Sequence, residues 1–504
     1  MIPNILLQIV SVPVLTSLFI YLIRRRKIAR KSGWIAGLAH LYTTLLLCLV
    51  GLRVYRGEVV YEWYRVGPKV NFALLADGLS LPIALVINLC VTALAFYSIR
   101  YIEHRIEEIY KGADEETEIM YYTRFFLLFP FFTTGFMGVI FSTNLIALYF
   151  FMEIMAPIPL YFIVAQFGYS DFMDRYRVAM LSLPWTLGPA FLFLVGIFLA
   201  YIQTGNFEIQ GLCALLENPL AKWVILFMLL GLLPKLAMFP FHVWMPLVHA
   251  EHPTCIAGLL PVYANIPAYV IARVLILPLY EEFKVFSFPL MIIALVTIIY
   301  GSLLTLAQND VKRFAACSTI SQISYSILGL STLNVWGVEG GLFFFLSHIM
   351  GKTILFSTAG ILVYVTGTRD IRKMGGLAAK MPLTALLWTI GAMMLSAFPP
   401  FSTFVAEWLM FTGVFISGVY SSLPKLIVAI LAISAVGLTV IYTFWALKRI
   451  FFGPLNPNLL SNHKIKDPPL TMSVPLLTLA AVATFLGLYP KPIMDLFHLV
   501  VRLP

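Results

Sequence analysis

The chain is an almost unbroken succession of apolar runs, each about 20 residues long and separated from the next by a short polar connection. A helix of that length crosses a hydrocarbon core about 30 Å thick. Of the 504 residues, 60% are hydrophobic and only 12% are charged, and the mean hydropathy is +0.91. This composition lies outside the range of soluble domains. The sequence therefore predicts an all-α, polytopic membrane protein.

The apolar runs predict about fourteen transmembrane helices. The first run has no basic residues before it and no small-residue cleavage site after it, so we expect a retained helix rather than a signal peptide. The expected helices lie near residues 4–23, 34–54, 78–100, 121–142, 144–165, 175–201, 220–248, 254–279, 286–307, 312–331, 337–364, 381–417, 425–451 and 470–489.

Basic residues gather in alternate connections, which predicts the orientation of the helices. One side holds three clusters: Arg24, Arg25, Arg26, Lys27, Arg30 and Lys31; Arg369, Arg372, Lys373 and Lys380; Lys448, Arg449, Lys464 and Lys466. The main basic residues on the opposite side are Arg53, Arg56, Arg65 and Lys69. Because basic connections stay in the cytoplasm, we expect a multi-pass protein of the cell (plasma) membrane with both termini on the non-cytoplasmic side. This arrangement explains the net charge of +10 without a nucleic-acid partner.

The five cysteines are scattered along the chain, with no Cys-x-x-Cys pair and no Cys/His cluster at metal-binding spacing. We therefore expect no metal site and no cofactor in this chain.

Prolines interrupt two of the expected helices deep inside their apolar runs. Pro234 and Pro240 break the first, and Pro399 and Pro400 break the second. Within a bilayer such a break is tolerated only beside other protein or a wet cavity, so broken helices mark transport sites. The two breaks take corresponding places if residues 121–279 and 286–451 are two five-helix repeats, which would be inverted because five is odd. Residues 1–120 would then add three helices and a loop, and residues 452–504 a loop and a helix.

Four ionisable side chains lie within apolar runs, where a charge costs about 2.5–3.5 kcal/mol. They are Glu153, Lys235, Lys352 and Glu407. If Glu153 and Lys235 approach each other, their attraction keeps both charged, and a proton arriving at one frees the other to donate onward. His348 lies four residues before Lys352 and so on the same helix face. These residues predict a proton or ion relay with no catalytic residue in this chain.

Each of these side chains also has an alternative interpretation. The pair of Glu153 and Lys235 would be a static ion pair that only fixes helix packing. Glu407 would be a capping or interfacial carboxylate near the second break. The histidines His242, His249 and His252 would be satisfied by backbone carbonyls, and their irregular spacing is a weak metal signal.

At these residues the chain resembles the antiporter-like subunits of respiratory complex I, of membrane-bound hydrogenases and of Mrp-type sodium/proton antiporters. The resemblance runs from about residue 75 to 455. The motifs that carry it, in order, are ADGLSLP at 76–82, FMEIMAPIPLYF at 151–162, LPKLAMFPFHVWMPLVHAEHPT at 233–254, NDVKRFAACSTISQISY at 309–325, HIMGKTILFSTAG at 348–360, TRDIRKMGGLAAKMP at 368–382 and ALKRIFFGP at 446–454.

The resemblance implies fourteen helices with two inverted five-helix units and a polar axis at the bilayer midplane. It implies relay roles for Glu153, Lys235, His249, His348, Lys352 and Glu407. One departure stands out, because Asn265 occupies the place of a lysine that usually connects the two half-channels, and an amide does not titrate. Tyr263 or water would then have to bridge the halves. Leu247 likewise replaces a usual acidic residue.

Three functions fit these expectations. The first is an H+- or Na+-translocating subunit of a redox-driven complex, with antiporter-like neighbours and a redox module as partners. The second is one subunit of a standalone Na+/H+ antiporter. The third is a non-conducting membrane scaffold, for which Asn265 is the main argument. A solute transporter also uses broken helices, but the motif set argues against it.

Overall fold

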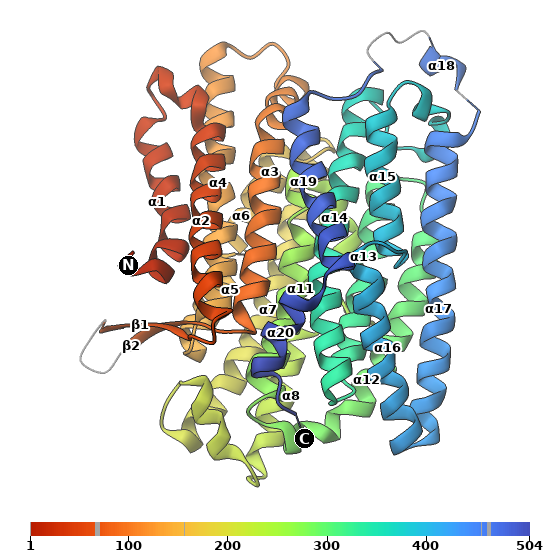
Figure 1. Cartoon of the computed structure of the whole chain (residues 1–504). Helices are drawn as coiled ribbons and strands as arrows, with labels where there is room; N and C mark the ends of the chain where they lie inside the picture. The colour runs from red at the N-terminus through yellow and green to blue at the C-terminus, as the bar shows by residue number, and fades with distance from the viewer. Residues whose placement is uncertain (1, 66–70, 156, 455, 461–464, 504) are drawn as a thin grey trace.

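A computed structural model describes residues 2–65, 71–155, 157–454, 456–460 and 465–503. The long helices run side by side in one bundle (Figure 1). In the first half of the chain the helices are α1 (Ile5–Ile23), α2 (Ser32–Val54), α3 (Ser80–Ile109), α4 (Glu115–Phe141), α5 (Leu145–Ile154), α6 (Pro157–Phe167), α7 (Phe172–Thr204), α8 (Leu220–Leu232), α9 (Trp244–Glu251), α10 (Thr254–Ala257) and α11 (Leu260–Val270).

The second half repeats this all-helical pattern. Its helices are α12 (Tyr280–Leu306), α13 (Val311–Leu330), α14 (Val335–Thr366), α15 (Pro382–Leu395), α16 (Ser402–Ser421), α17 (Leu423–Leu447), α18 (Pro457–Leu460), α19 (Leu470–Leu488) and α20 (Lys491–Val500). Short 3-10 turns are η1 (Lys27–Lys31), η2 (Ile209–Leu215), η4 (Ile371–Lys373) and η5 (Leu377–Ala379), and π-helical turns are η3 (Ile271–Ile276) and η6 (Lys448–Phe452).

The predicted fold class is confirmed. Among the described residues, twelve helices are long and apolar enough to cross a membrane. The number fourteen stays a prediction, because α13 is too polar for that criterion and α8 and α15 are short halves of broken helices. The boundaries of the two repeats stay predictions as well.

One all-helical expectation is wrong, since a β-hairpin lies in a region expected to be a plain connection. Strands β1 (Val60–Arg65) and β2 (Asn71–Ala76) pair antiparallel, with Val60 opposite Ala76. The hairpin extends from one edge of the bundle (Figure 1). The Glu62 carboxylate accepts hydrogen bonds from the backbone N–H groups of Leu6 and Leu7, each at 2.9 Å. The hairpin therefore holds the start of α1.

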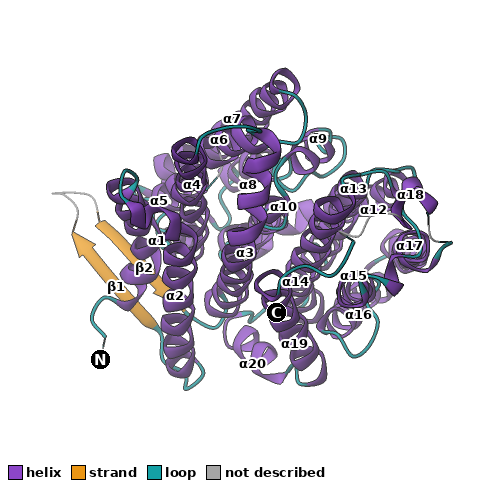
Figure 2. Ribbon diagram, turned by 90° about the horizontal axis from the view of Figure 1, so that it is seen from above, coloured by secondary structure: helices purple, strands orange, loops and turns teal. Residues whose placement is uncertain are grey.

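Polar and apolar residues are distributed as expected for a protein dissolved in lipid. The outer helices α1, α7 and α17 expose large apolar side chains such as Leu18, Phe191 and Ile441. In contrast, α11 is buried along its whole length, and so is α14 from Gly337 to Val363. Seen from above, α14 lies inside the bundle between α3 and α13 (Figure 2). Ionisable groups on these central helices are therefore shielded from both water and lipid.

The two broken helices have the same backbone geometry. The first break separates α8 from α9, and the second separates α15 from α16. An alanine with positive φ lies in each, 50° at Ala237 and 52° at Ala397, a conformation that costs about 1–2 kcal/mol outside glycine. Matching backbone hydrogen bonds close the two turns: Ala237 N to Pro234 O, Met238 N to Leu233 O and Phe241 N to Met238 O; Ala397 N to Met394 O, Phe398 N to Met393 O and Phe401 N to Phe398 O.

The two breaks also run in opposite directions through the bundle, because α8 lies near the lower edge of Figure 1 and leads upward, whereas α15 starts near the upper edge and leads down to α16. This opposition is the relationship expected of inverted repeats. Both breaks lie where Pro234, Pro240, Pro399 and Pro400 predict them.

Candidate functional site

The predicted ion pair is present beside the first break. The Lys235 ammonium lies 3.2 Å from Oε1 of Glu153 and is fully buried, while the Glu153 side chain is 17% exposed. Lys235 also donates to the backbone carbonyl of Thr186 on α7, at 3.2 Å. Oε2 of Glu153 has no hydrogen-bond partner among the described residues. One carboxylate oxygen therefore holds the lysine, and the other is free to accept a proton.

The break in the helix gives Lys235 this position. Prolines 234 and 240 remove backbone donors, and the freed Pro234 carbonyl accepts a hydrogen bond from the Trp244 indole at 3.0 Å. The same Trp244 ring lies edge-on to Tyr263 and to His249, with ring centroids 6.3 and 5.7 Å away. The indole thus closes the break and packs the next two polar residues against it.

Tyr263 and His249 line the interior beyond the ion pair. The Lys235 ammonium is 5.9 Å from the centre of the Tyr263 ring. Neither the Tyr263 hydroxyl nor either His249 nitrogen has a hydrogen-bond partner in the described part of the chain, although all are buried. Buried polar atoms are normally hydrogen-bonded, so these positions call for water or a transferred ion.

Asn265 connects the two halves of the bundle. Its amide nitrogen donates to the Pro261 carbonyl at 2.6 Å and contacts Nδ1 of His348 on α14 at 3.2 Å. The Pro261 carbonyl fixes the amide orientation, because an amide oxygen facing it would be repelled. Nδ1 of His348 must then accept the hydrogen bond. We infer that neutral His348 carries its proton on Nε2.

Lys352 lies one turn further along α14 and is also fully buried. Its ammonium donates to the Ala315 carbonyl at 3.0 Å and to the Ser318 hydroxyl at 2.5 Å, both on α13. Four residues beyond Ser318, the Gln322 amide donates to Thr439 and Tyr442 of α17, at 3.3 and 3.4 Å. Hydroxyl and amide groups of α13 therefore continue the polar path that starts at Glu153.

Glu407 lies at the far end of this path, on α16. Thr403 and Phe411, four residues before and after it, are buried, so the carboxylate faces the bundle. Its charge is within electrostatic reach of the Tyr325 and Tyr442 hydroxyls. In the residues that the structure describes, no hydrogen-bond or ion-pair partner stabilises it. Glu407 is therefore not the capping carboxylate of the alternative interpretation.

Two cations inside the bundle were missed by sequence reasoning. Lys312 on α13 is fully buried and donates to the His252 carbonyl at 2.5 Å. It lies within electrostatic reach of His249, as does Lys352, so the histidine lies between two lysines. Arg273, largely buried, pairs with Asp77 at 2.7 Å. Both cations lie near helix ends, where a long side chain normally extends to the interface, so the sequence alone carried no sign of their burial.

The remaining histidines fit the alternative interpretation in part. Nδ1 of His252 lies 2.7 Å from the Val248 carbonyl, whereas Nδ1 of His242 has no partner among the described residues. No group of three potential metal ligands gathers within the described ranges.

A bundle that is apolar outside and carries a line of ionisable groups through two broken helices defines a polytopic membrane protein with a charged interior. Residues 142–437 match the family described as NADH:quinone oxidoreductase/Mrp antiporter, transmembrane. Since this match covers more than half of the chain, the protein belongs to that family.

Curated relatives extend the match over almost the whole chain. Subunit M of the F(420)H(2) dehydrogenase of Methanosarcina mazei is 30% identical over 97% of this chain and 95% of its own length. NAD(P)H-quinone oxidoreductase chain 4 of a Synechococcus species is 28% identical over 98% and 92%. The large Na(+)/H(+) antiporter protein of Alkalihalophilus pseudofirmus is 28% identical over 84% of this chain, but only 53% of its own length is covered.

Solved structures show the same fold. A chain of respiratory complex I from Thermus thermophilus aligns with a TM-score of 0.83 at 23% identity, covering 99% of both chains. A chain of the Mrp complex from a Dietzia species aligns with a TM-score of 0.83 at 20% identity, over 99% of this chain and 96% of that one. A chain of an archaeal membrane-bound sulfane sulfur reductase aligns with a TM-score of 0.81 at 22% identity, over 98% and 96%.

Proposed function

We propose that this protein moves H+ or Na+ across the membrane as the antiporter-like subunit of a larger, redox-driven complex. The observation that carries the proposal is the contact of Lys235 with Glu153 at 3.2 Å, buried at a break in a membrane helix. A charge pair at such a place is costly to maintain, and its usual role is in ion or proton transfer.

The proposed transfer starts at the free oxygen of Glu153. A cation arriving there neutralises the carboxylate and weakens its hold on Lys235. The lysine then donates toward Tyr263 and His249, whose unpartnered polar atoms would be bridged by water. Each step moves charge between groups that already lie in the bundle interior, so no charge has to enter lipid.

Asn265 does not carry a proton, so His348 has to receive it at Nε2 and pass it toward Lys352. The amide contact holds the imidazole in the tautomer that keeps Nδ1 as acceptor. Ser318, Gln322 and the α17 hydroxyls then lead toward Glu407, which would release the ion. The proposed relay therefore consists of Glu153, Lys235, His249, His348, Lys352 and Glu407, with Tyr263 and Asn265 between its halves.

The extent of the matches favours a redox complex over a standalone antiporter as the setting. The dehydrogenase protein from Methanosarcina mazei matches almost end to end, whereas only about half of the antiporter protein from Alkalihalophilus pseudofirmus is covered. By analogy with the complexes of these relatives, the partners would be further membrane subunits and a redox module that supplies the energy.

The test uses the native complex in sealed vesicles, with redox turnover and ion movement recorded together. Lys235→Ala is expected to abolish ion movement while the complex stays assembled. Lys222→Ala, an exposed lysine at the start of the same broken helix, is the control and should pump normally. Runs in Na+-free buffer separate H+ from Na+. Undiminished pumping by Lys235→Ala would favour the scaffold function instead.

A further inference from the structure

A connection of a few residues between α6 and α7 covers the fully buried Lys312. Tyr169 on this connection is half-buried, so one edge of it reaches the surface while the ring faces inward. The Lys312 ammonium lies 3.6 Å from the centre of the Tyr169 ring. Arg105 and Arg369 lie 4.1 and 5.5 Å from the same centre. Three cations therefore surround one aromatic ring.

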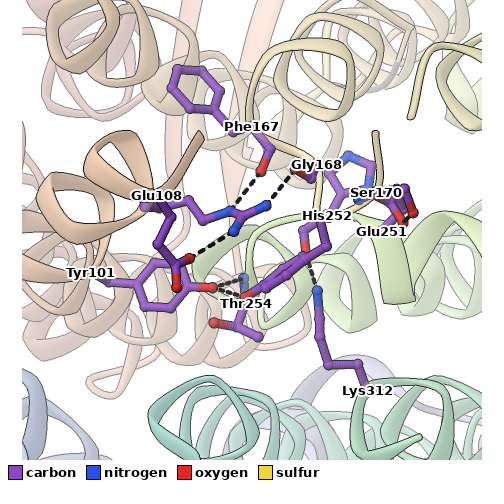
Figure 3. Close-up of polar contacts among 11 residues, drawn as sticks. Tyr101, Glu108, Phe167, Gly168, Ser170, Glu251, His252, Thr254 and Lys312 are labelled. Atoms are coloured by element: carbon purple, nitrogen blue, oxygen red, sulfur yellow. Dashed lines mark hydrogen bonds and ion pairs between the residues drawn. The ribbon is translucent and has the colours of Figure 1, made fainter. Parts of the chain in front are cut away.

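Two charged residues hold this connection from opposite sides (Figure 3). On one side, Arg105 donates to the carbonyls of Phe167 and Gly168, at 3.4 and 2.6 Å. On the other, the Glu251 carboxylate accepts from the Ser170 backbone N–H at 2.6 Å and from its hydroxyl at 2.9 Å. Tyr169 lies between these two attachments and is thereby fixed in place.

Gly168 permits this close seating. A Cβ atom at that position would lie 2.7 Å from the Val164 carbonyl and 2.9 Å from Oε1 of Glu251. The Tyr169 hydroxyl contacts the Tyr101 hydroxyl, which in turn accepts from the Thr254 backbone N–H at 3.3 Å. The ring is thus anchored at its edge to the buried start of α10.

The Lys312 ammonium needs this ring. It has three N–H donors, but the His252 carbonyl is the one hydrogen-bond acceptor that it reaches in the described structure. No carboxylate lies within ion-pairing distance of it there. The face of an aromatic ring attracts a cation while excluding water. Removing the ring would therefore leave an ammonium that water must hydrate, and the nearest water lies on the surface beyond Tyr169.

We propose that Tyr169 is a plug that closes a path for water and small monovalent cations between this face of the bundle and Lys312. Because Lys312 is within electrostatic reach of His249, the path would lead to the relay. The plug deepens the proposed function by assigning the place at which ions gain access. Tyr169 acts on the relay by position, and it does not itself carry the ion.

The experiment uses Cys255, which is fully buried next to Thr254 and within electrostatic reach of both Tyr101 and Lys312. With the other four cysteines replaced, this thiol is labelled in the native complex by a small cationic methanethiosulfonate, and the mass gain is followed over time. Labelling should be slow with Tyr169, at least tenfold faster in Tyr169→Ala, and slow again in Tyr169→Phe, which keeps the ring. Tyr176→Ala, an exposed tyrosine on α7, is the matched control.

If Tyr169→Ala does not assemble, Tyr169→Leu removes the aromatic face while keeping apolar bulk, and faster labelling is expected there too. Labelling as slow as in the parent, in an assembled Ala or Leu variant, would overturn the plug. This readout does not depend on transport. A separate passive H+ leak in Tyr169→Ala vesicles, absent when Lys235→Ala is added, would connect the plug to the relay; fast labelling without such a leak would uphold the plug and contradict the proposed function.

Discussion

The Asn265 amide donates a hydrogen bond to Nδ1 of His348 at 3.2 Å, and this contact joins α11 of the first half to α14 of the second. A residue that cannot titrate therefore lies at the centre of the charged interior. Its second N–H is bound to the Pro261 carbonyl, so the contact with His348 has a fixed direction. The consequence is that Asn265 orients a proton carrier instead of being one.

Replacing Asn265 with leucine should slow ion movement about tenfold, since a lost buried hydrogen bond is worth about 1–1.5 kcal/mol and frees His348 to adopt the other tautomer. Asn88→Leu is the control, because Asn88 is equally buried but its amide bonds Thr43 and Thr44 outside the path. That variant should lose thermal stability and still pump. Equal pumping by the two assembled variants would show that Asn265 only packs the bundle.

Removing one member of the central ion pair should destabilise the protein more than removing both. Glu153→Leu leaves the fully buried Lys235 without its carboxylate, which costs about 3–5 kcal/mol. Adding Lys235→Met should restore most of the lost stability without restoring ion movement. Thermal unfolding of the purified variants measures the first effect and vesicle assays the second. A double variant as unstable as the sum of the single ones would argue against direct pairing.

Glu407→Gln should behave differently, because the carboxylate has no hydrogen-bond or ion-pair partner to lose within the described part of the chain. We expect an unchanged unfolding temperature and a loss of ion movement of at least about tenfold, since an amide cannot bind and release a proton. A marked fall in stability with normal pumping would indicate a structural carboxylate.

The pair of Asp77 and Arg273 should be structural. Oδ1 of Asp77 accepts from the backbone of Leu79 and Ser80 at the start of α3, while Oδ2 binds Arg273 at 2.7 Å. Asp77→Asn keeps the helix cap and loses the ion pair, whereas Asp77→Ala loses both and should be less stable than Asp77→Asn by about 1 kcal/mol. Both variants should pump once assembled, and a specific loss of ion movement in Asp77→Asn would place this pair in the relay.

The fold was predictable because the bilayer leaves few choices: apolar length predicts helices and proline predicts breaks, as Pro234 and Pro400 illustrate. The hairpin at Val60–Arg65 was missed because its strands are short and lie between two long membrane runs. The amphipathic α20 was missed since ten residues cannot span a membrane.

Site residues were predictable where charge is costly. Glu153 and Lys235 stand out against apolar neighbours, and their proximity is seen in the structure. Lys312 was not singled out, because a lysine at the first turn of a helix normally reaches water, and only the packing of Tyr169 shows that it does not. Tyr169 itself is one aromatic residue among many, and its role depends on three cations from distant segments.

The central claim is that the pair of Glu153 and Lys235 opens and closes as ions move. Infrared difference spectroscopy of the native complex during redox turnover measures this directly, because a carboxylate that takes up a proton gains the carbonyl band of a neutral carboxyl. The account predicts such a band in the parent, shifted in D2O and absent in Glu153→Gln. If turnover with ion movement leaves Glu153 charged throughout, with no band that the Gln variant removes, the proposed relay is contradicted.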